Sequence, residues 1–135
     1  MGEAAVDVFR KSEIEMEGGL PDNFVGEVHL QRLERGQHKP FLRLYRVEFA
    51  QEARTNWHFH DTLQILYVLE GQCRLGGRDG KLQTLAAGDM ARIEPFLEHF
   101  HGADGTGAMV HLAMMIGEEV ETKWLEPVSD KAYGI

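Results

Sequence analysis

The 135-residue sequence has one cysteine, four prolines and few basic residues, with 14 Lys and Arg against 22 Asp and Glu. The lone thiol, Cys73, cannot form a disulfide within the chain, so we expect it to be packed and inert. The net charge of −8 argues against nucleic acids and anionic membrane surfaces, because both attract a basic face. No apolar run approaches the ~18 residues that would span a membrane.

The first residues of the chain also lack the hydrophobic core of a secretion signal, which together with the single cysteine favours a reducing, cytoplasmic location. A chain of this length fits one domain and can bury a core without disulfide cross-links. We expect residues 1–22 to form a polar N-terminal arm and residues 23–135 to form the domain with its C-terminal tail.

Short β-strands dominate the pattern after the arm. Phe41–Phe49 alternates with a period near two, and Leu63–Leu69 is an apolar run of strand length. The turn residues at 76–80 predict a hairpin, and the tail after Glu118 is expected to form a helical turn packed outside the domain. This organisation predicts an all-β sandwich or barrel. The other expected strands are Phe24–Leu30, Asn56–His60, Asp89–Ile93, Glu98–Phe100 and Ala108–Met115.

Two His-x-His pairs are the most informative chemical feature. Side chains two residues apart on a strand point to the same face, so His58 and His60 lie side by side, as do His99 and His101. The two pairs can converge only if their strands are neighbours in the fold. Gln64 opens the next apolar run, and its side-chain oxygen is a neutral metal ligand.

The stretch Trp57–Gly71, WHFHDTLQILYVLEG, resembles the first sequence motif of the cupin superfamily, and Gly88–Pro95 followed by His99 resembles the second. The resemblance implies a single-domain cupin fold, the double-stranded β-helix or jelly-roll barrel. It also implies one divalent metal ion per chain. Carried over residue by residue, the implied metal ligands are His58, His60, Gln64 and His99.

The chain departs from the usual cupin pattern in two places. Gln64 replaces the usual Glu of the first motif, and Phe96 follows Pro95 where the second motif usually has a glycine. The first departure makes all four implied ligands neutral. The ion would keep its full charge and act as a stronger Lewis acid.

Within the superfamily, the chain resembles the bacterial cupin-type hydroxynitrile lyases, notably over Ala53–His58, His99–Ala103 and Met109–Ala113. That resemblance implies manganese, with iron, zinc or nickel as alternatives, and a lyase reaction on cyanohydrins or related hydroxy and carbonyl compounds. His111 is then the candidate general base, and His101 is the second candidate.

Several alternatives remain open from sequence alone. An iron-dependent cupin dioxygenase would use a similar ligand set, and a non-catalytic cupin would bind metal or ligand without turnover. Tyr45, Val47 and Met115 either line the pocket around the ion or form plain core packing. The substrate is expected to be a small molecule. The arm and the outward-facing Ile65, Tyr67 and Leu69 predict a homodimer or a higher homo-oligomer.

Overall fold

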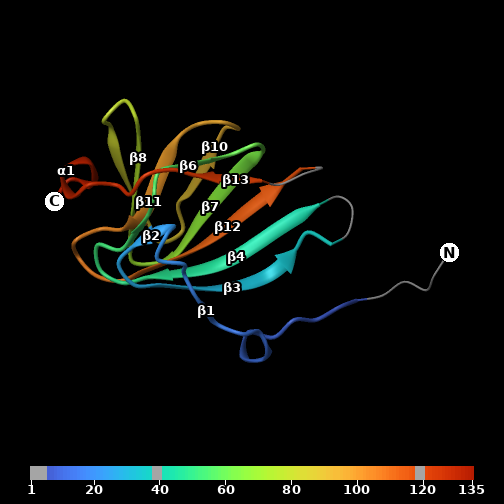
Figure 1. Cartoon of the computed structure of the whole chain (residues 1–135). Coiled ribbons are helices and arrows are strands. Elements are labelled where there is room, and N and C mark those ends of the chain that lie inside the picture. The colour runs from blue at the N-terminus through green and yellow to red at the C-terminus, as the bar shows by residue number, and fades with distance from the viewer. Residues whose placement is uncertain (1–5, 38–40, 118–120) are drawn as a thin grey trace.

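A computed structural model describes residues 6–37, 41–117 and 121–135 as two facing antiparallel sheets (Figure 1). The first sheet has the strand order β1-β3-β4-β12-β7-β10, and its strands are β1 (Glu17–Gly18), β3 (Val28–Arg35), β4 (Leu42–Phe49), β12 (Met109–Ile116), β7 (Leu63–Glu70) and β10 (Met90–Ile93). The second has the order β13-β6-β11-β5-β2, with β8 on β11 and β9 on β8, and its strands are β13 (Thr122–Trp124), β6 (His58–His60), β11 (His99–Ala103), β5 (Arg54–Thr55), β2 (Phe24–Val25), β8 (Gln72–Gly77) and β9 (Leu82–Ala86).

This arrangement confirms the expected all-β jelly roll and the hairpin at residues 76–80, which joins β8 to β9. The strand expected over Phe24–Leu30 is corrected. It breaks at Gly26, which has a φ of +85° and lies so close to Ala53 that a Cβ would be 2.8 Å from the Ala53 Cβ. The chain resumes as β3 and continues to Arg35. The short β1 and β13 were not predicted, because two or three residues carry too little periodic signal.

Alternation along β7 separates the interior from the outer face. Gln64, Leu66 and Val68 are buried, whereas Tyr67 and Leu69 are exposed. An apolar core fills one end of the space between the sheets, and its buried members are Val28, Val47, Phe49, Ala53, Val68, Cys73, Leu85, Ala103 and Met109. Burial raises the pKa of the Cys73 thiol to about 12, as expected for an inert cysteine.

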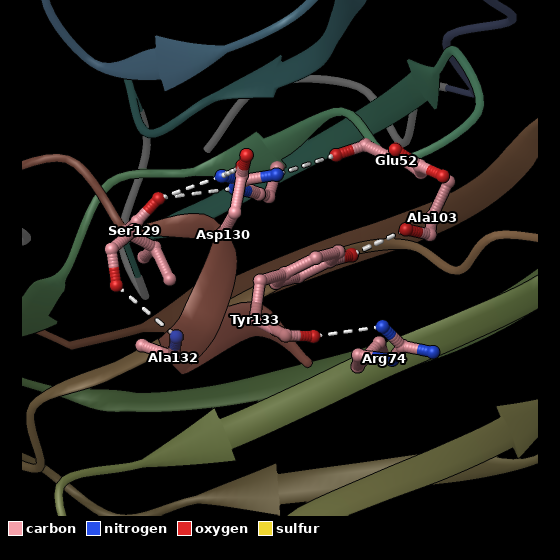
Figure 2. Close-up of polar contacts among 9 residues, drawn as sticks. Glu52, Arg74, Ala103, Ser129, Asp130, Ala132 and Tyr133 are labelled. Carbon is pink, nitrogen blue, oxygen red and sulfur yellow. Dashed lines mark hydrogen bonds and ion pairs between the residues drawn. The ribbon is translucent and has the colours of Figure 1, made fainter. Parts of the chain in front are cut away.

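The C-terminal tail packs on the outside of the second sheet, where Trp57, Phe100 and Tyr133 form a separate buried cluster. The tail ends in α1 (Asp130–Tyr133), a single turn capped by Ser129, whose hydroxyl accepts a hydrogen bond from the backbone N–H of residue 132. Figure 2 shows Tyr133 lying against β11, where its hydroxyl donates to the carbonyl oxygen of Ala103. The tail thus supports the strand that carries His99 and His101.

The N-terminal arm joins the first sheet through β1, which pairs with β3. Gln31 on β3 donates to the carbonyl oxygens of Lys11, the first residue of the short helix η1 (Lys11–Glu13), and of Ile14, which follows that helix. Residues 6–10, before η1, extend away from the sheets (Figure 1), and residues 1–5 lie outside the described residues. The arm boundary at residue 22 and the homodimer stay predictions. No helix among the described residues has the length and apolar character to cross a membrane.

Candidate metal centre

The two histidine pairs meet because β6 and β11 are neighbours in the second sheet. His99 lies directly opposite His58 in the antiparallel register. The ring centroids of His58 and His99 are 4.3 Å apart, and those of His58 and His60 are 5.0 Å apart. One ring nitrogen from each of His58, His60 and His99 lies within 4.8 Å of the others, so three buried imidazoles are placed to hold one metal ion.

Each of the three rings is oriented by a hydrogen bond at Nδ1. His58 Nδ1 lies 2.9 Å from the carbonyl oxygen of Asn56, and His99 Nδ1 lies 2.8 Å from that of Leu97. A carbonyl oxygen only accepts, so we assign the hydrogen to Nδ1 in both rings, which leaves the Nε2 lone pair available. His60 Nδ1 is 2.9 Å from the Thr122 hydroxyl, and its buried Nε2 has no partner in the described part of the chain. Supports of this kind are typical of metal-binding histidines.

Gln64 reaches the cluster from β7 in the opposite sheet. Its Oε1 lies 3.0 Å from His99 Nε2, and its Nε2 donates to the Met115 sulfur at 3.6 Å. With the hydrogen of His99 on Nδ1, His99 Nε2 and Gln64 Oε1 face each other with lone pairs and no hydrogen between them. A cation bound by both atoms would relieve this repulsion. Bonds of about 2.1 Å at right angles around one ion would place two ligand atoms about 3 Å apart. The four sequence-predicted ligands therefore fit a divalent ion.

The three imidazoles of the cluster are in the protonation state that binds a cation. Burial is the main cause that lowers the pKa of His60 and His99 to about 4 and that of His58 well below its usual value. All three imidazoles are neutral at neutral pH, which is the form that coordinates a metal. Since Gln64 is also neutral, this donor set contributes no negative charge.

Two further histidines lie beside the cluster. His111 Nε2 is 2.9 Å from His101 Nδ1, and the His101 ring centroid is 5.3 Å from that of His58. Burial lowers the pKa of His111 to about 4 and that of His101 well below its usual value. Within the described residues, His101 Nε2 and His111 Nδ1 are buried without a hydrogen-bond partner. The pair can accept a proton, and one nitrogen of each ring is left without a hydrogen bond from the described part of the protein.

One cavity of 370 Å³ between the sheets is lined by His58, His60 and Gln64 of the cluster and by His101 and His111. Tyr45, Val47 and Met115 line it, so the stripe on β4 forms pocket wall rather than only core packing. The outer end of the cavity carries more exposed polar residues, among them Arg32, whose Nε donates to Glu17 at 2.9 Å. The cavity lining therefore combines buried histidines, apolar side chains and more exposed charged residues.

Sequence reasoning missed the contribution of β13 to this site. Thr122 orients His60, and the Trp124 ring lies 4.8 Å from the His58 ring and lines the cavity. The two residues are two apart and share a face of the strand, and this spacing was the only signal in the sequence. Thr55 was also missed, and its hydroxyl accepts a hydrogen bond from the backbone N–H of His101.

The departure at Phe96 leaves the loop before His99 intact. Phe96 has a φ of +65°, the left-handed region that favours glycine, and its ring is largely exposed. Its backbone N–H donates to the carbonyl oxygen of His60 at 2.7 Å. This bond ties the loop to β6 and so helps to fix His99 beside His60.

Comparison with known proteins agrees with this geometry. Residues 45–115 match the family described as "Cupin domain". An (R)-mandelonitrile lyase of Granulicella tundricola is 35% identical over 119 residues, which are 85% of this chain and 88% of the relative. The crystal structure of a cupin-like protein from Thermotoga maritima is 29% identical and superposes with a TM-score of 0.81 over 95% of each chain. The polyketide cyclase RemF of Streptomyces resistomycificus, 18% identical, shares the fold with a TM-score of 0.76 over 96% of this chain and 91% of its own.

Proposed function

The chain belongs to the cupin family, and from that premise we propose that it is a metal-dependent lyase that cleaves cyanohydrins or closely related hydroxy and carbonyl compounds. The observation that carries the proposal is the juxtaposition of two neutral histidine groups at one cavity, which His58, His60, His101 and His111 line. His58, His60 and His99 form the donor cluster, and His101 with His111 forms a proton-accepting pair beside it. The similarity to a mandelonitrile lyase supports the same reaction class.

We propose that His58, His60, Gln64 and His99 hold one divalent ion. Manganese is the metal that the resemblance to the hydroxynitrile lyases implies, and imidazole and amide donors also suit iron, zinc or nickel. When bound, such an ion supplies Lewis-acid chemistry that lowers the pKa of a substrate hydroxyl group. The neutral donor set favours this role because it leaves the charge of the ion uncompensated.

The proton-accepting role falls to His111, with His101 as its partner. Both rings are neutral at neutral pH, and the 2.9 Å contact between them lets a proton taken up at one ring be shared with the other. In the proposed reaction an imidazole accepts the hydroxyl proton, the carbon–oxygen bond becomes a carbonyl, and the electron pair of the carbon–carbon bond leaves with cyanide. The protonated pair then returns the proton to cyanide.

The proposal is tested by incubating mandelonitrile with the metal-free protein and with the manganese-loaded protein, and following benzaldehyde release with and without oxygen. We expect cleavage that requires the metal and proceeds equally in both atmospheres. Cleavage that requires oxygen would favour a dioxygenase instead. Tight binding of small hydroxy compounds with no turnover of any of them would favour a non-catalytic cupin.

A further inference from the structure

The outer end of the cavity carries charge that the proposed reaction does not use. Glu17, Arg32 and Arg43 line the cavity there, in a chain whose net charge is −8. The histidines at the inner end are neutral, so these three residues give the protein lining a charge of +1. A positive cavity in an acidic protein favours entry of an anion, because low-dielectric walls focus the field.

The two arginines differ in whether they have partners. Arg32 donates to Glu17 at 2.9 Å and stacks 5.6 Å from the centre of the Tyr45 ring. Arg43 forms no ion pair with any carboxylate among residues 6–37, 41–117 and 121–135. Its aliphatic stem lies against Gly36, where an added Cβ would come within 3.2 Å of the Arg43 Cγ. Arg43 is therefore a supported guanidinium with no carboxylate partner within the described ranges, and its N–H groups can bind an acceptor from outside.

The sheet register places Arg43 at a distance from the donor cluster that a small molecule can span. Arg43 on β4 is opposite Met115 on β12, and Met115 is opposite Gln64 on β7. Two strand spacings separate the backbone positions of Arg43 and Gln64 by about 10 Å. Both side chains line the cavity, and Tyr45 lies in the next row of the same strand. A compound with a single ring or a short chain can contact both ends.

We propose that the natural substrate carries a carboxylate at the end remote from its reacting hydroxyl or carbonyl group, and that Arg43 binds this carboxylate. The proposal rests on the function proposed above and adds the substrate class. A planar guanidinium with free N–H groups matches a carboxylate in a paired, two-point contact. Arg43 would then decide which hydroxy or carbonyl compounds are bound with their reacting end at the histidines.

The test measures binding rather than turnover. The manganese-loaded full chain is titrated calorimetrically with 4-(hydroxymethyl)benzoate and with its neutral isostere 4-(hydroxymethyl)benzamide. We expect the carboxylate to bind about 10- to 100-fold more tightly, as for hydrogen bonds to a charged group. Arg43→Met should abolish this preference, and Arg43→Lys should retain only part of it. Arg92→Met removes the same charge from an exposed site on β10 outside the cavity and should leave the preference unchanged.

Equal binding of the two probes by the wild-type protein would overturn the proposal. So would a preference that survives in a folded Arg43→Met or Arg43→Lys variant at full size, because the carboxylate would then be held elsewhere, for instance at the metal. Mandelonitrile cleavage is measured on the same preparations. Its absence would contradict the lyase assignment while the binding comparison still reports on Arg43, and cleavage without any carboxylate preference would remove the Arg43 proposal alone.

Discussion

The Nε2 atom of His111 and the Nδ1 atom of His101 are 2.9 Å apart. The other ring nitrogens, His111 Nδ1 and His101 Nε2, have no hydrogen-bond partner among the described residues. The two rings come from different sheets, β12 and β11, so the contact also joins the two layers. Phe49 packs against both rings, at centroid distances of 5.1 and 6.2 Å, and keeps water from one side of the pair. The pair is thus a buried, neutral proton acceptor that borders the cavity.

Replacing His111 should remove this acceptor without removing the metal. His111→Gln keeps a polar side chain of similar size that takes up no proton near neutral pH, so we expect kcat for mandelonitrile cleavage to fall about 100- to 10,000-fold. Manganese content, measured by elemental analysis, should stay at the wild-type value. If His101→Gln lost activity to this extent and His111→Gln did not, the role of base would pass to His101.

Replacing Gln64 by the glutamate usual in cupins should change the affinity and reactivity of the metal and leave the fold unchanged. Gln64→Glu adds a negative charge to the donor set, so we expect Mn²⁺ to bind on the order of tenfold or more tightly and cleavage to slow, because the ion becomes a weaker Lewis acid. Titration with Mn²⁺ and steady-state kinetics measure the two effects. Gln83→Glu, at an exposed position on β9, makes the same charge change away from the cavity and should alter neither. Weaker Mn²⁺ binding in Gln64→Glu would contradict the placement of Gln64 in the donor set.

The metal-free protein should lose stability in mild acid. The pKa values of His60, His99 and His111 are lowered to about 4, below the ordinary value of 6.5 that the unfolded chain has. Below pH 6.5 the unfolded chain therefore binds protons that the folded chain does not. The free energy of unfolding is therefore unaffected by protonation of these histidines above pH 6.5. It decreases as the pH falls from 6.5 toward 4, by about 1.4 kcal/mol per pH unit for each such histidine.

Urea unfolding of the metal-free protein between pH 7 and pH 4 measures this dependence. His111→Gln should reduce the slope of the unfolding free energy against pH by roughly one proton, since it removes one buried imidazole. His29→Gln is the matched control, because the His29 side chain is 45% exposed on β3 and meets solvent in the folded protein. An unchanged slope in His111→Gln would show that this ring is already protonated in the folded state.

The hydroxyl of Tyr133 should stabilise the second sheet measurably. Tyr133 is fully buried, and its hydroxyl bonds to Ala103, two residues from His101 on β11 (Figure 2). Tyr133→Phe leaves the buried carbonyl oxygen of Ala103 without this donor, so we expect a loss of about 1–3 kcal/mol in the free energy of unfolding. Tyr67→Phe, at a side chain exposed on β7, should cost much less. Equal losses in the two variants would contradict a supporting role for the C-terminal tail.

Sequence periodicity was sufficient for the local part of the site. Two residues on one strand share a face whatever the fold, so alternation alone pairs His58 with His60 and His99 with His101. Their convergence depended on the resemblance to a family, because it requires that β6 and β11 be neighbours, with His99 opposite His58. No local pattern specifies that register.

The remaining parts of the site arise from contacts between distant segments. The His101–His111 contact joins two sheets, and the row of Arg43, Met115 and Gln64 exists only because β12 lies between β4 and β7 in one register. The support that Thr122 gives to His60 spans 62 residues. Long-range pairing of this kind is set by packing of the whole barrel, and single-sequence patterns do not contain it.

The most direct test of the metal centre is titration of the metal-free protein with Mn²⁺ by calorimetry, with elemental analysis of the dialysed product. We predict one ion per chain in the wild-type protein and binding weakened at least about 100-fold in His99→Ala, with His29→Ala unchanged. Absence of stoichiometric binding in the wild-type protein, or wild-type affinity in His99→Ala, would contradict it.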